Sequence, residues 1–358
     1  MKLHFFLLFN VCVILFCETY LDFIVQQKCE WPSVKDNKNV LHAMILADTH
    51  LLGPIRGHWL DKLYREWHMR RSFQSSISLF NPDIIFVLGD LFDEGDLVDM
   101  QEFDSYVQRF QKYFNISHNI PLITVAGNHD VGFHYRLNEF FINRFEKHFN
   151  NTGVELYTLK DVHFVLINSM AMENDGCRYC TTAQQKLNKI SDQLECLKKP
   201  STCTDVNTLQ AHKKYSRPIL MQHFPTYRIS DAACKEYEVQ KFERYRENWE
   251  VLSKNSTVLL GKLLQPRLAF AGHSHYFCRS INSLGIEEYT VASFNWRNNI
   301  NPSFLLASFT TDDYKVAKCN MLKQNIIFSV FVVLMIIYVA VLLYKIKKFI
   351  QTYFKKKS

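Results

Sequence analysis

The sequence is poor in the residues that usually separate domains. It has 11 glycines and 9 prolines among 358 residues, and neither is concentrated in the middle of the chain. It also has no internal repeat and no low-complexity segment, so a repeat architecture is not expected. We therefore predict one large domain at residues 40–320, which is long enough that core size is not limiting.

The sequence also lacks a basic stripe with interleaved aromatic residues. The formal net charge is +7, but six of the lysines lie within residues 345–358 and the rest of the chain is close to neutral. Nucleic-acid binding requires basic residues gathered on a folded face. We therefore expect no nucleic-acid partner.

No charged residue occurs in residues 326–344, an apolar run long enough to cross a bilayer. A buried core helix is the alternative, but the run has no polar face. We predict one transmembrane helix at residues 324–344. The lysines that follow place a basic tail, residues 345–358, in the cytosol, and therefore the large domain on the luminal side.

Counted from the C-terminus, Lys355 and Lys356 are the fourth and third residues. Lysines in this position resemble the dilysine signal by which coat machinery returns membrane proteins to the endoplasmic reticulum. The alternative is a stop-transfer flank that binds anionic lipid.

The N-terminal apolar run covers residues 5–16 and is broken only by Asn10. A full span needs about 20 residues, so this run fits a signal-peptide core or a short signal anchor. No small-x-small cleavage pattern follows Cys17, and we favour an uncleaved anchor at residues 1–25. Residues 26–39 are polar and are predicted to form a linker.

Eight cysteines lie between the two apolar ends, and an even number in an oxidising lumen predicts disulfides whose pairing stays open. They are Cys29, Cys177, Cys180, Cys196, Cys203, Cys234, Cys278 and Cys319. Cys177 and Cys180 form a C-x-x-C pair, for which structural zinc or redox chemistry is the alternative to a plain disulfide. Sequons begin at Asn115, Asn150 and Asn255.

Short apolar runs that end in polar clusters alternate with helical patterns in the first part of the chain. Predicted strands at residues 40–47, 84–88 and 121–125 alternate with predicted helices at residues 59–80 and 100–114. This order indicates a β-α-β layered sheet, in which functional groups collect at the carboxyl ends of the strands.

The second part of the chain is expected to supply further strands and two helices. The strands are predicted at residues 155–159, 162–168, 217–222 and 267–271, with residues 287–292 and 304–310 in a second sheet; the helices are predicted at residues 138–149 and 242–252. Residues 171–203 are interpreted as an irregular insertion, tied by disulfides near the mouth of a cleft.

Oxygen and imidazole donors follow five of the predicted strands. They are Asp48 and His50, Asp90, Asn128 and His129, His223, and His273 and His275. One such aspartate is often a helix cap, but five placements together indicate one site. Without a thiolate, this donor set suits manganese, iron or zinc. The donors are too many for one tetrahedral ion, and a shared carboxylate lets two ions sit about 3.5–4 Å apart.

The same residues resemble the signature of the calcineurin-like metallophosphoesterases. The matching blocks are Asp48-x-His50, Gly89-Asp90-x-x-Asp93, Gly127-Asn-His-Asp130, His223 and Gly272-His-x-His275. The resemblance implies a four-layer α/β/β/α sandwich and two metal ions. It implies that Asp48, His50, Asp90 and His275 bind one ion, and that Asp90, Asn128, His223 and His273 bind the other.

The resemblance also implies roles for the remaining residues of these blocks. His129 would lie close to the leaving-group oxygen, as an acid or as a phosphate contact, and Asp130 would orient it by accepting its ring proton. Asp93 is expected to support a ligand rather than to bind metal. The implied reaction is attack on phosphorus by a hydroxide that the two ions activate.

Three runs fit a membrane-anchored branch of this family: ADTHLLG at residues 47–53, GDLFDEG at residues 89–95 and SFNWR at residues 293–297. Resemblance to that branch implies a manganese-dependent phosphodiesterase that removes ethanolamine-phosphate from the second mannose of GPI anchors. It further implies a role in endoplasmic-reticulum exit of GPI-anchored proteins, between exit sites and the cis-Golgi. A luminal phosphoesterase for another phospholipid head group or a phosphoprotein, and a non-catalytic cargo receptor, are the alternatives.

Overall fold

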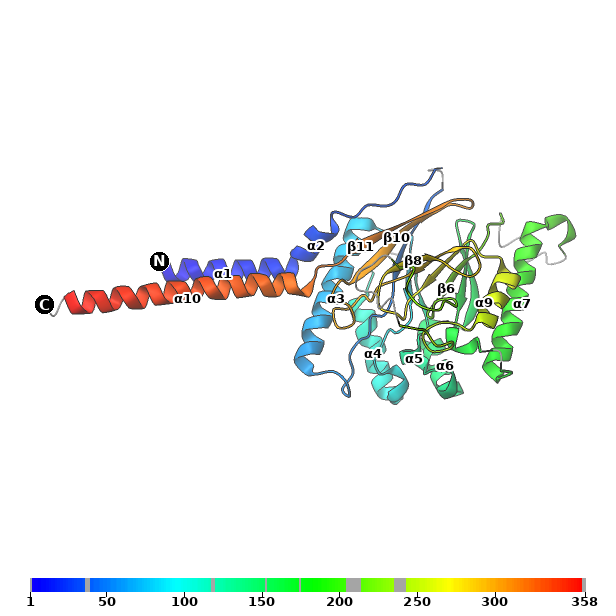
Figure 1. Cartoon of the computed structure of the whole chain (residues 1–358), viewed down its shortest axis with the longest axis horizontal. Coiled ribbons are helices and arrows are strands. Elements are labelled where there is room, and N and C mark those ends of the chain that lie inside the picture. Colours follow the sequence, from blue (N-terminus) through cyan, green and yellow to red (C-terminus); the bar gives the residue numbers. More distant parts are fainter. Residues whose placement is uncertain are drawn as a thin grey trace.

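Two helices at opposite ends of the chain form a stalk on one side of the body (Figure 1). They are α1 (Lys2–Thr19) and α10 (Gln324–Lys355). The computed structural model describes residues 2–35, 39–116, 120–151, 153–173, 175–203, 214–234 and 243–355. Lys356, half of the predicted dilysine signal, lies outside the described residues.

Within the described part of the chain, α10 contains a 29-residue stretch, Gln324–Thr352, long and apolar enough to cross a membrane. The shorter apolar helix Leu8–Thr19 belongs to α1. Anchoring through the C-terminal helix therefore agrees with the sequence.

The first sheet of the body has five strands in the order β11-β10-β1-β2-β3. Their bounds are β1 (Leu41–Leu46), β2 (Ile84–Leu88), β3 (Leu122–Val125), β10 (Ser303–Phe309) and β11 (Tyr314–Asn320). The first three are parallel, and β10 runs antiparallel to β1. The assignment of residues 304–310 to the second sheet was wrong, because β10 pairs along β1. Strand β11 was not predicted.

The second sheet has six strands in the order β4-β5-β6-β7-β9-β8. Their bounds are β4 (Val154–Leu159), β5 (Val162–Ile167), β6 (Ile219–Gln222), β7 (Leu268–Ala271), β8 (Cys278–Ile281) and β9 (Glu287–Thr290). Strand β5 is parallel to β6, β6 to β7, and β7 to β9. Of these six strands, only β8 was not predicted.

The inner faces of the two sheets share one apolar core. Phe86 of β2 contacts Phe164 of β5, with ring centroids 4.7 Å apart, and Phe164 also contacts Phe309 of β10. Because side chains alternate along a strand, the other face of each sheet is apolar too and is covered by helices. Figure 1 shows α3 (Trp59–Phe80) and α4 (Met100–Tyr113) over the first sheet, and α7 (Arg178–Lys198) and α9 (Lys254–Leu264) over the second. The predicted α/β/β/α sandwich is confirmed.

Two predictions of local structure were wrong. The supposed irregular insertion contains α7, a helix of 21 residues. Ala183, Leu187, Ile190 and Leu194 are buried at helical spacing on one of its faces. Residues 243–252, part of a predicted helix, form a turn instead, and helix α9 begins only after Ser253, whose side chain accepts a hydrogen bond from the Ser256 N–H.

The other helices in the described part of the chain are short. They are α2 (Leu21–Gln26), α5 (Asn128–Val131) and α6 (Glu139–Phe149), with 3-10 turns at Gly95–Leu97, His134–Arg136, Ser169–Ala171 and Pro200–Thr202. Helix α2 belongs to the folded body, because Gln26 donates hydrogen bonds to the carbonyl and hydroxyl of Ser72 in α3, and Ser72 donates to Asp22.

All eight cysteines between the apolar ends form disulfides, as expected. The pairs are Cys29–Cys319, Cys177–Cys180, Cys196–Cys203 and Cys234–Cys278. Of the alternatives for Cys177 and Cys180, the structure therefore supports the plain disulfide. Cys29–Cys319 joins the segment after α2 to the last residues of β11, next to the start of α10.

We expect the Cys29–Cys319 bond to stabilise the body more than the Cys196–Cys203 bond. The two bonds link residues 290 and 7 positions apart, and closing a longer loop removes more entropy from the unfolded chain. The loop-entropy model gives losses of about 6 and about 2 kcal/mol when each pair is replaced by serine. Thermal unfolding of the full-length protein in detergent, without reductant, measures both. Equal losses would contradict the loop argument.

Candidate metal centre

The five polar clusters meet where parallel strands of the two sheets end. Asp48 and His50 follow β1, Asp90 follows β2, and Asn128 and His129 begin α5 after β3. His223 follows β6, and His273 and His275 follow β7. The structure brings the seven predicted ligands into two adjoining groups, and Asp90 belongs to both.

Backbone conformations near this centre are unusual. The φ angles of Asp48, His50 and Asp90 are 54°, 42° and 49°, and those of His273 and His275 are 72° and 64°. Residues other than glycine seldom adopt the left-handed region, and such strain is concentrated at functional sites. Gly127 allows the close approach of two strand ends, since a Cβ atom there would lie 2.2 Å from the Asp90 nitrogen.

The first group contains Asp48, His50, Asp90 and His275. The Nε2 atoms of His50 and His275 face each other at 3.1 Å. His50 Nε2 also lies 3.9 Å from Asp48 Oδ1 and 3.6 Å from Asp90 Oδ2, and His275 Nε2 lies 3.7 Å from Asp48 Oδ1. Three of the four residues are buried, and His275 is partly exposed.

The second group contains Asp90, Asn128, His223 and His273. The fully buried His223 places Nε2 3.2 Å from Asp90 Oδ2 and 3.1 Å from Asn128 Oδ1. The Nδ1 atom of His273 lies 3.3 Å from the same Nε2. Asp90 therefore presents one carboxylate oxygen, Oδ2, between His50 of the first group and His223 of the second.

Hydrogen bonds on the outer side of three histidines direct a ring nitrogen into the centre. The Nδ1 of His223 donates to the Leu88 carbonyl at 2.7 Å, and the Nε2 of His273 donates to the Trp249 carbonyl at 2.7 Å. His50 contacts Asp93 through Nδ1 at 3.1 Å. In the neutral tautomers the inward nitrogens carry lone pairs. Lone pairs that face one another repel, and a cation placed between them removes this repulsion. The residues present thus fit a pair of divalent ions.

The two central carboxylates have opposite pKa shifts. Burial, with a contribution from Asp90, raises the pKa of Asp48 well above its ordinary range. Burial also opposes ionisation of Asp90, but His223 and His129 hold its pKa well below the ordinary range. Burial and the neighbouring His50 hold the pKa of His275 well below that of a free imidazole, which favours its neutral, ligating form.

Asp93 supports the centre in the manner expected. One oxygen accepts from His50, and the other accepts from Arg297 Nη1 at 2.8 Å. Burial opposes ionisation, but the bonds and charges of His50 and Arg297 lower the pKa of Asp93 to about 2. Asp93 therefore stays ionised and fixes the orientation of the His50 ring.

The expected bond between Asp130 and His129 was wrong. Asp130 accepts three backbone N–H bonds, from Gly127, Leu91 and Phe92, and so ties the end of β3 to the loop after β2. The Nδ1 of His129 instead donates to the Asp93 carbonyl at 2.8 Å. The two loops are positioned by Asp130, while a backbone carbonyl orients His129.

Two arginines near the centre were not predicted as site residues. Arg297 holds Asp93, and Arg56 Nη1 donates to the Asp93 carbonyl at 3.0 Å, 3.4 Å from His129 Nδ1. Arg297 lies inside the run at residues 293–297 that carried a resemblance, so a signal existed. Arg56 lies in a loop whose composition gave none.

Two adjoining groups of metal donors at the strand ends of an α/β/β/α sandwich are the arrangement expected of a metallophosphoesterase. The sequence model of the calcineurin-like phosphoesterases matches residues 41–277, and the chain belongs to that family. It is 56% identical over 345 residues to the Metallophosphoesterase 1 homolog of Drosophila melanogaster, covering 96% of this chain and 93% of that protein. It is 43% identical over 348 residues to Metallophosphoesterase 1 of Gallus gallus, covering 91% of this chain and 86% of that protein.

Solved structures agree with the fold. A dimetal phosphatase from Danio rerio superposes with a TM-score of 0.50 at 14% identity, covering 79% of this chain and 97% of that one. A purple acid phosphatase from yellow lupin superposes with a TM-score of 0.52 at 13% identity, covering 82% of this chain and 54% of that one. At such identities the likeness concerns the fold alone.

Replacing Asp90 with alanine is expected to remove both metal ions, because this residue contributes to both groups of donors. Elemental analysis of the purified full-length protein measures bound metal, and hydrolysis of a small phosphodiester measures activity. An Asp90→Ala protein that retains activity would contradict a two-ion centre. Asp83→Asn is a matched control, since Asp83 pairs with Lys160 away from the donor groups.

Replacing His129 with alanine is expected to slow turnover by about 10²–10⁴-fold, the usual contribution of one positioned acid or base. Its metal content should match that of the unmodified protein, because His129 contacts the Asp93 carbonyl and is not one of the seven predicted ligands. Loss of metal from this variant would assign His129 to the ligand set instead.

Proposed function

We propose that this protein is a membrane-anchored, luminal phosphodiesterase that works with two divalent cations. Asp48, His50, Asp90 and His275 hold one ion, and Asp90, Asn128, His223 and His273 hold the other. The observation that carries the proposal is the single oxygen of Asp90 lying within 3.6 Å of His50 and 3.2 Å of His223, each in a separate donor group.

When bound, two such ions neutralise phosphoryl oxygens and activate water for in-line attack. The residues around them position the substrate and the proton. His129 donates through Nδ1 to the Asp93 carbonyl. Burial opposes protonation of the ring, but Asp90 and the Asp93 carbonyl raise the pKa of His129 above its ordinary value, and in the protonated ring the Nε2–H donates to the leaving oxygen. Arg56 lies beside His129 and is exposed, which allows its guanidinium to contact an oxygen of the phosphodiester.

Three features support a membrane-borne substrate on the luminal side. The helix that ends the chain can cross a membrane, the body is held by four disulfides, and the sequon asparagines Asn115, Asn150 and Asn255 are exposed. Disulfides persist in oxidising compartments. We further propose that coat machinery binds the cytosolic dilysine tail. The protein then cycles between endoplasmic-reticulum exit sites, the intermediate compartment and the cis-Golgi.

The substrate that we propose is the ethanolamine-phosphate on the second mannose of GPI anchors, removed so that GPI-anchored proteins leave the endoplasmic reticulum. The support is the resemblance of three sequence runs together with the similarity to proteins named Metallophosphoesterase 1. Manganese is the proposed metal, with iron and zinc as alternatives, because the donors are carboxylates, an amide and imidazoles without a thiolate.

Mass analysis of GPI anchors from cells lacking this protein tests the substrate. We expect the ethanolamine-phosphate to remain on the second mannose, and re-expression of the unmodified protein, but not of Asp90→Ala, to remove it. An unaltered glycan would favour a luminal phosphoesterase for another head group or a phosphoprotein. Rescue by Asp90→Ala would favour a cargo receptor without catalysis.

Replacing Lys355 and Lys356 with serine is expected to move the protein towards later Golgi compartments, because coat recognition needs both charges. Fluorescence microscopy against compartment markers measures the shift. Replacing Lys345 and Lys347 is the matched control, since it removes two charges beside the membrane and leaves the terminal pair. An unchanged distribution of the first variant would leave only the lipid-binding role for the terminal lysines.

A further inference from the structure

Three aromatic side chains form an open surface on the body, which we call the aromatic shelf. Tyr135 is 67% exposed and Trp249 is 42% exposed, and their rings stack with centroids 5.9 Å apart at 28°. Phe133 lies half-buried against Trp249, with ring centroids 5.1 Å apart. Neighbouring large aromatic rings that remain exposed often mark a binding surface.

The aromatic shelf borders the metal centre. The carbonyl of Trp249 accepts the hydrogen bond that orients His273, at 2.7 Å. From Phe133 the contacts continue through the buried Phe224, whose ring centroid lies 6.1 Å from that of Phe133 and 4.4 Å from that of His273. A ligand on the shelf is therefore next to the second group of donors.

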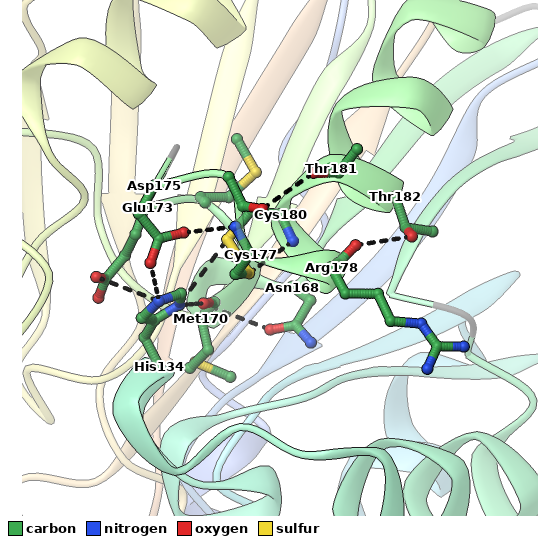
Figure 2. Close-up of a disulfide and its surroundings, with 12 residues drawn as sticks. His134, Asn168, Met170, Glu173, Asp175, Cys177, Arg178, Cys180, Thr181 and Thr182 are labelled. Carbon is green, nitrogen blue, oxygen red and sulfur yellow. Dashed lines mark hydrogen bonds and ion pairs between the residues drawn. A yellow bond between two sulfur atoms is a disulfide. The ribbon is translucent and has the colours of Figure 1, made fainter.

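Hydrogen bonds hold the Phe133–Tyr135 segment of the shelf from behind. His134 stands between Phe133 and Tyr135, and its Nδ1 donates to the Met170 carbonyl at 2.9 Å while its Nε2 contacts Asp175 at 2.8 Å. Figure 2 shows His134 pointing towards Glu173 and Asp175, beside the Cys177–Cys180 disulfide at the start of α7. Since these bonds fix the segment before any ligand arrives, binding there costs little ordering of the protein.

We propose that the aromatic shelf is a subsite for a sugar ring of the substrate, placed beside the phosphodiester at the metal centre. This proposal rests on the proposed function and deepens it, because it assigns glycan recognition to specific residues. The flat C–H face of a pyranose ring carries partial positive charge and packs on the negative face of an aromatic ring. Tyr135, the more exposed of the two stacked rings, offers such a face at the edge of the site.

The polar groups around the shelf favour a sugar over an acyl chain or an apolar peptide. Arg246 lies over the Trp249 ring, 4.7 Å from its centroid, and is paired with Glu250. An apolar ligand would displace the water that is hydrogen-bonded to this ion pair and to the Tyr135 hydroxyl, and it would supply no hydrogen bond in return. Sugar hydroxyls both donate and accept, so they satisfy these groups while the ring stacks.

Two substrates for the manganese-loaded full-length protein test the subsite: a small diester of ethanolamine-phosphate with methanol, which has neither a sugar nor an aromatic ring, and an ethanolamine-phosphate ester of a mannoside. In Tyr135→Ala and Trp249→Leu we expect kcat/KM for the mannoside, divided by that for the small diester, to fall about 10-fold through KM, as when one stacked ring is lost. Tyr135→Phe keeps the stacking face and should lie close to the unmodified protein. Phe140→Ala removes an exposed aromatic residue of α6, 51% exposed, and should leave the ratio unchanged.

An equal fall for both substrates in Tyr135→Ala would show a structural role only and would overturn the subsite. Binding of a phosphate-free oligomannoside, measured by calorimetry, separates this proposal from the proposed function. Binding that is present in the unmodified protein and lost in Tyr135→Ala supports the shelf even where the mannoside ester is not cleaved. Absence of binding to the unmodified protein overturns the shelf, whatever the protein hydrolyses.

Discussion

The carboxylate of Asp90 is the point on which the structure of the site depends. It is buried at the end of β2, its Oδ1 accepts the His129 N–H at 2.8 Å, and its Oδ2 lies between His50 and His223. A buried carboxylate is costly unless cations or hydrogen-bond donors surround it. The histidines from β1 and from the second sheet converge on this carboxylate as further candidate ligands of such cations, which requires the two sheets to meet at this edge.

Support for that carboxylate comes from backbone geometry as much as from side chains. The left-handed conformations of Asp48 and Asp90 turn the chain sharply after β1 and β2, and the Asp130 carboxylate joins the loop after β2 to the end of β3 through three N–H bonds. The strain of these turns is offset by the large apolar core between the sheets. Fold stability and site geometry are thus linked at the strand ends.

Much of this arrangement could be predicted from the sequence, because apolar runs followed by polar clusters identify buried strands and what stands at their ends. The parallel strands β1, β2 and β3 and the candidate side chains at the strand ends were found in this way, whereas the choice of seven of them as metal ligands came from the family resemblance and stays a prediction. Strand β10 was placed in the wrong sheet because alternation along a strand does not say which neighbour it pairs with. The partner of His129 was missed because a backbone carbonyl, such as that of Asp93, leaves no mark in the sequence.

The disulfide between Cys29 and Cys319 has a further consequence. It clamps the chain leaving the N-terminal helices to the strand that leads into α10, and α1 and α10 lie side by side in the stalk (Figure 1). Because this bond closes next to the start of α10, the anchored body has less freedom to swivel than one joined to its helix by a flexible tether. The height of the metal centre above the bilayer is then nearly constant, so access to it depends on how far a phosphate group stands from the membrane.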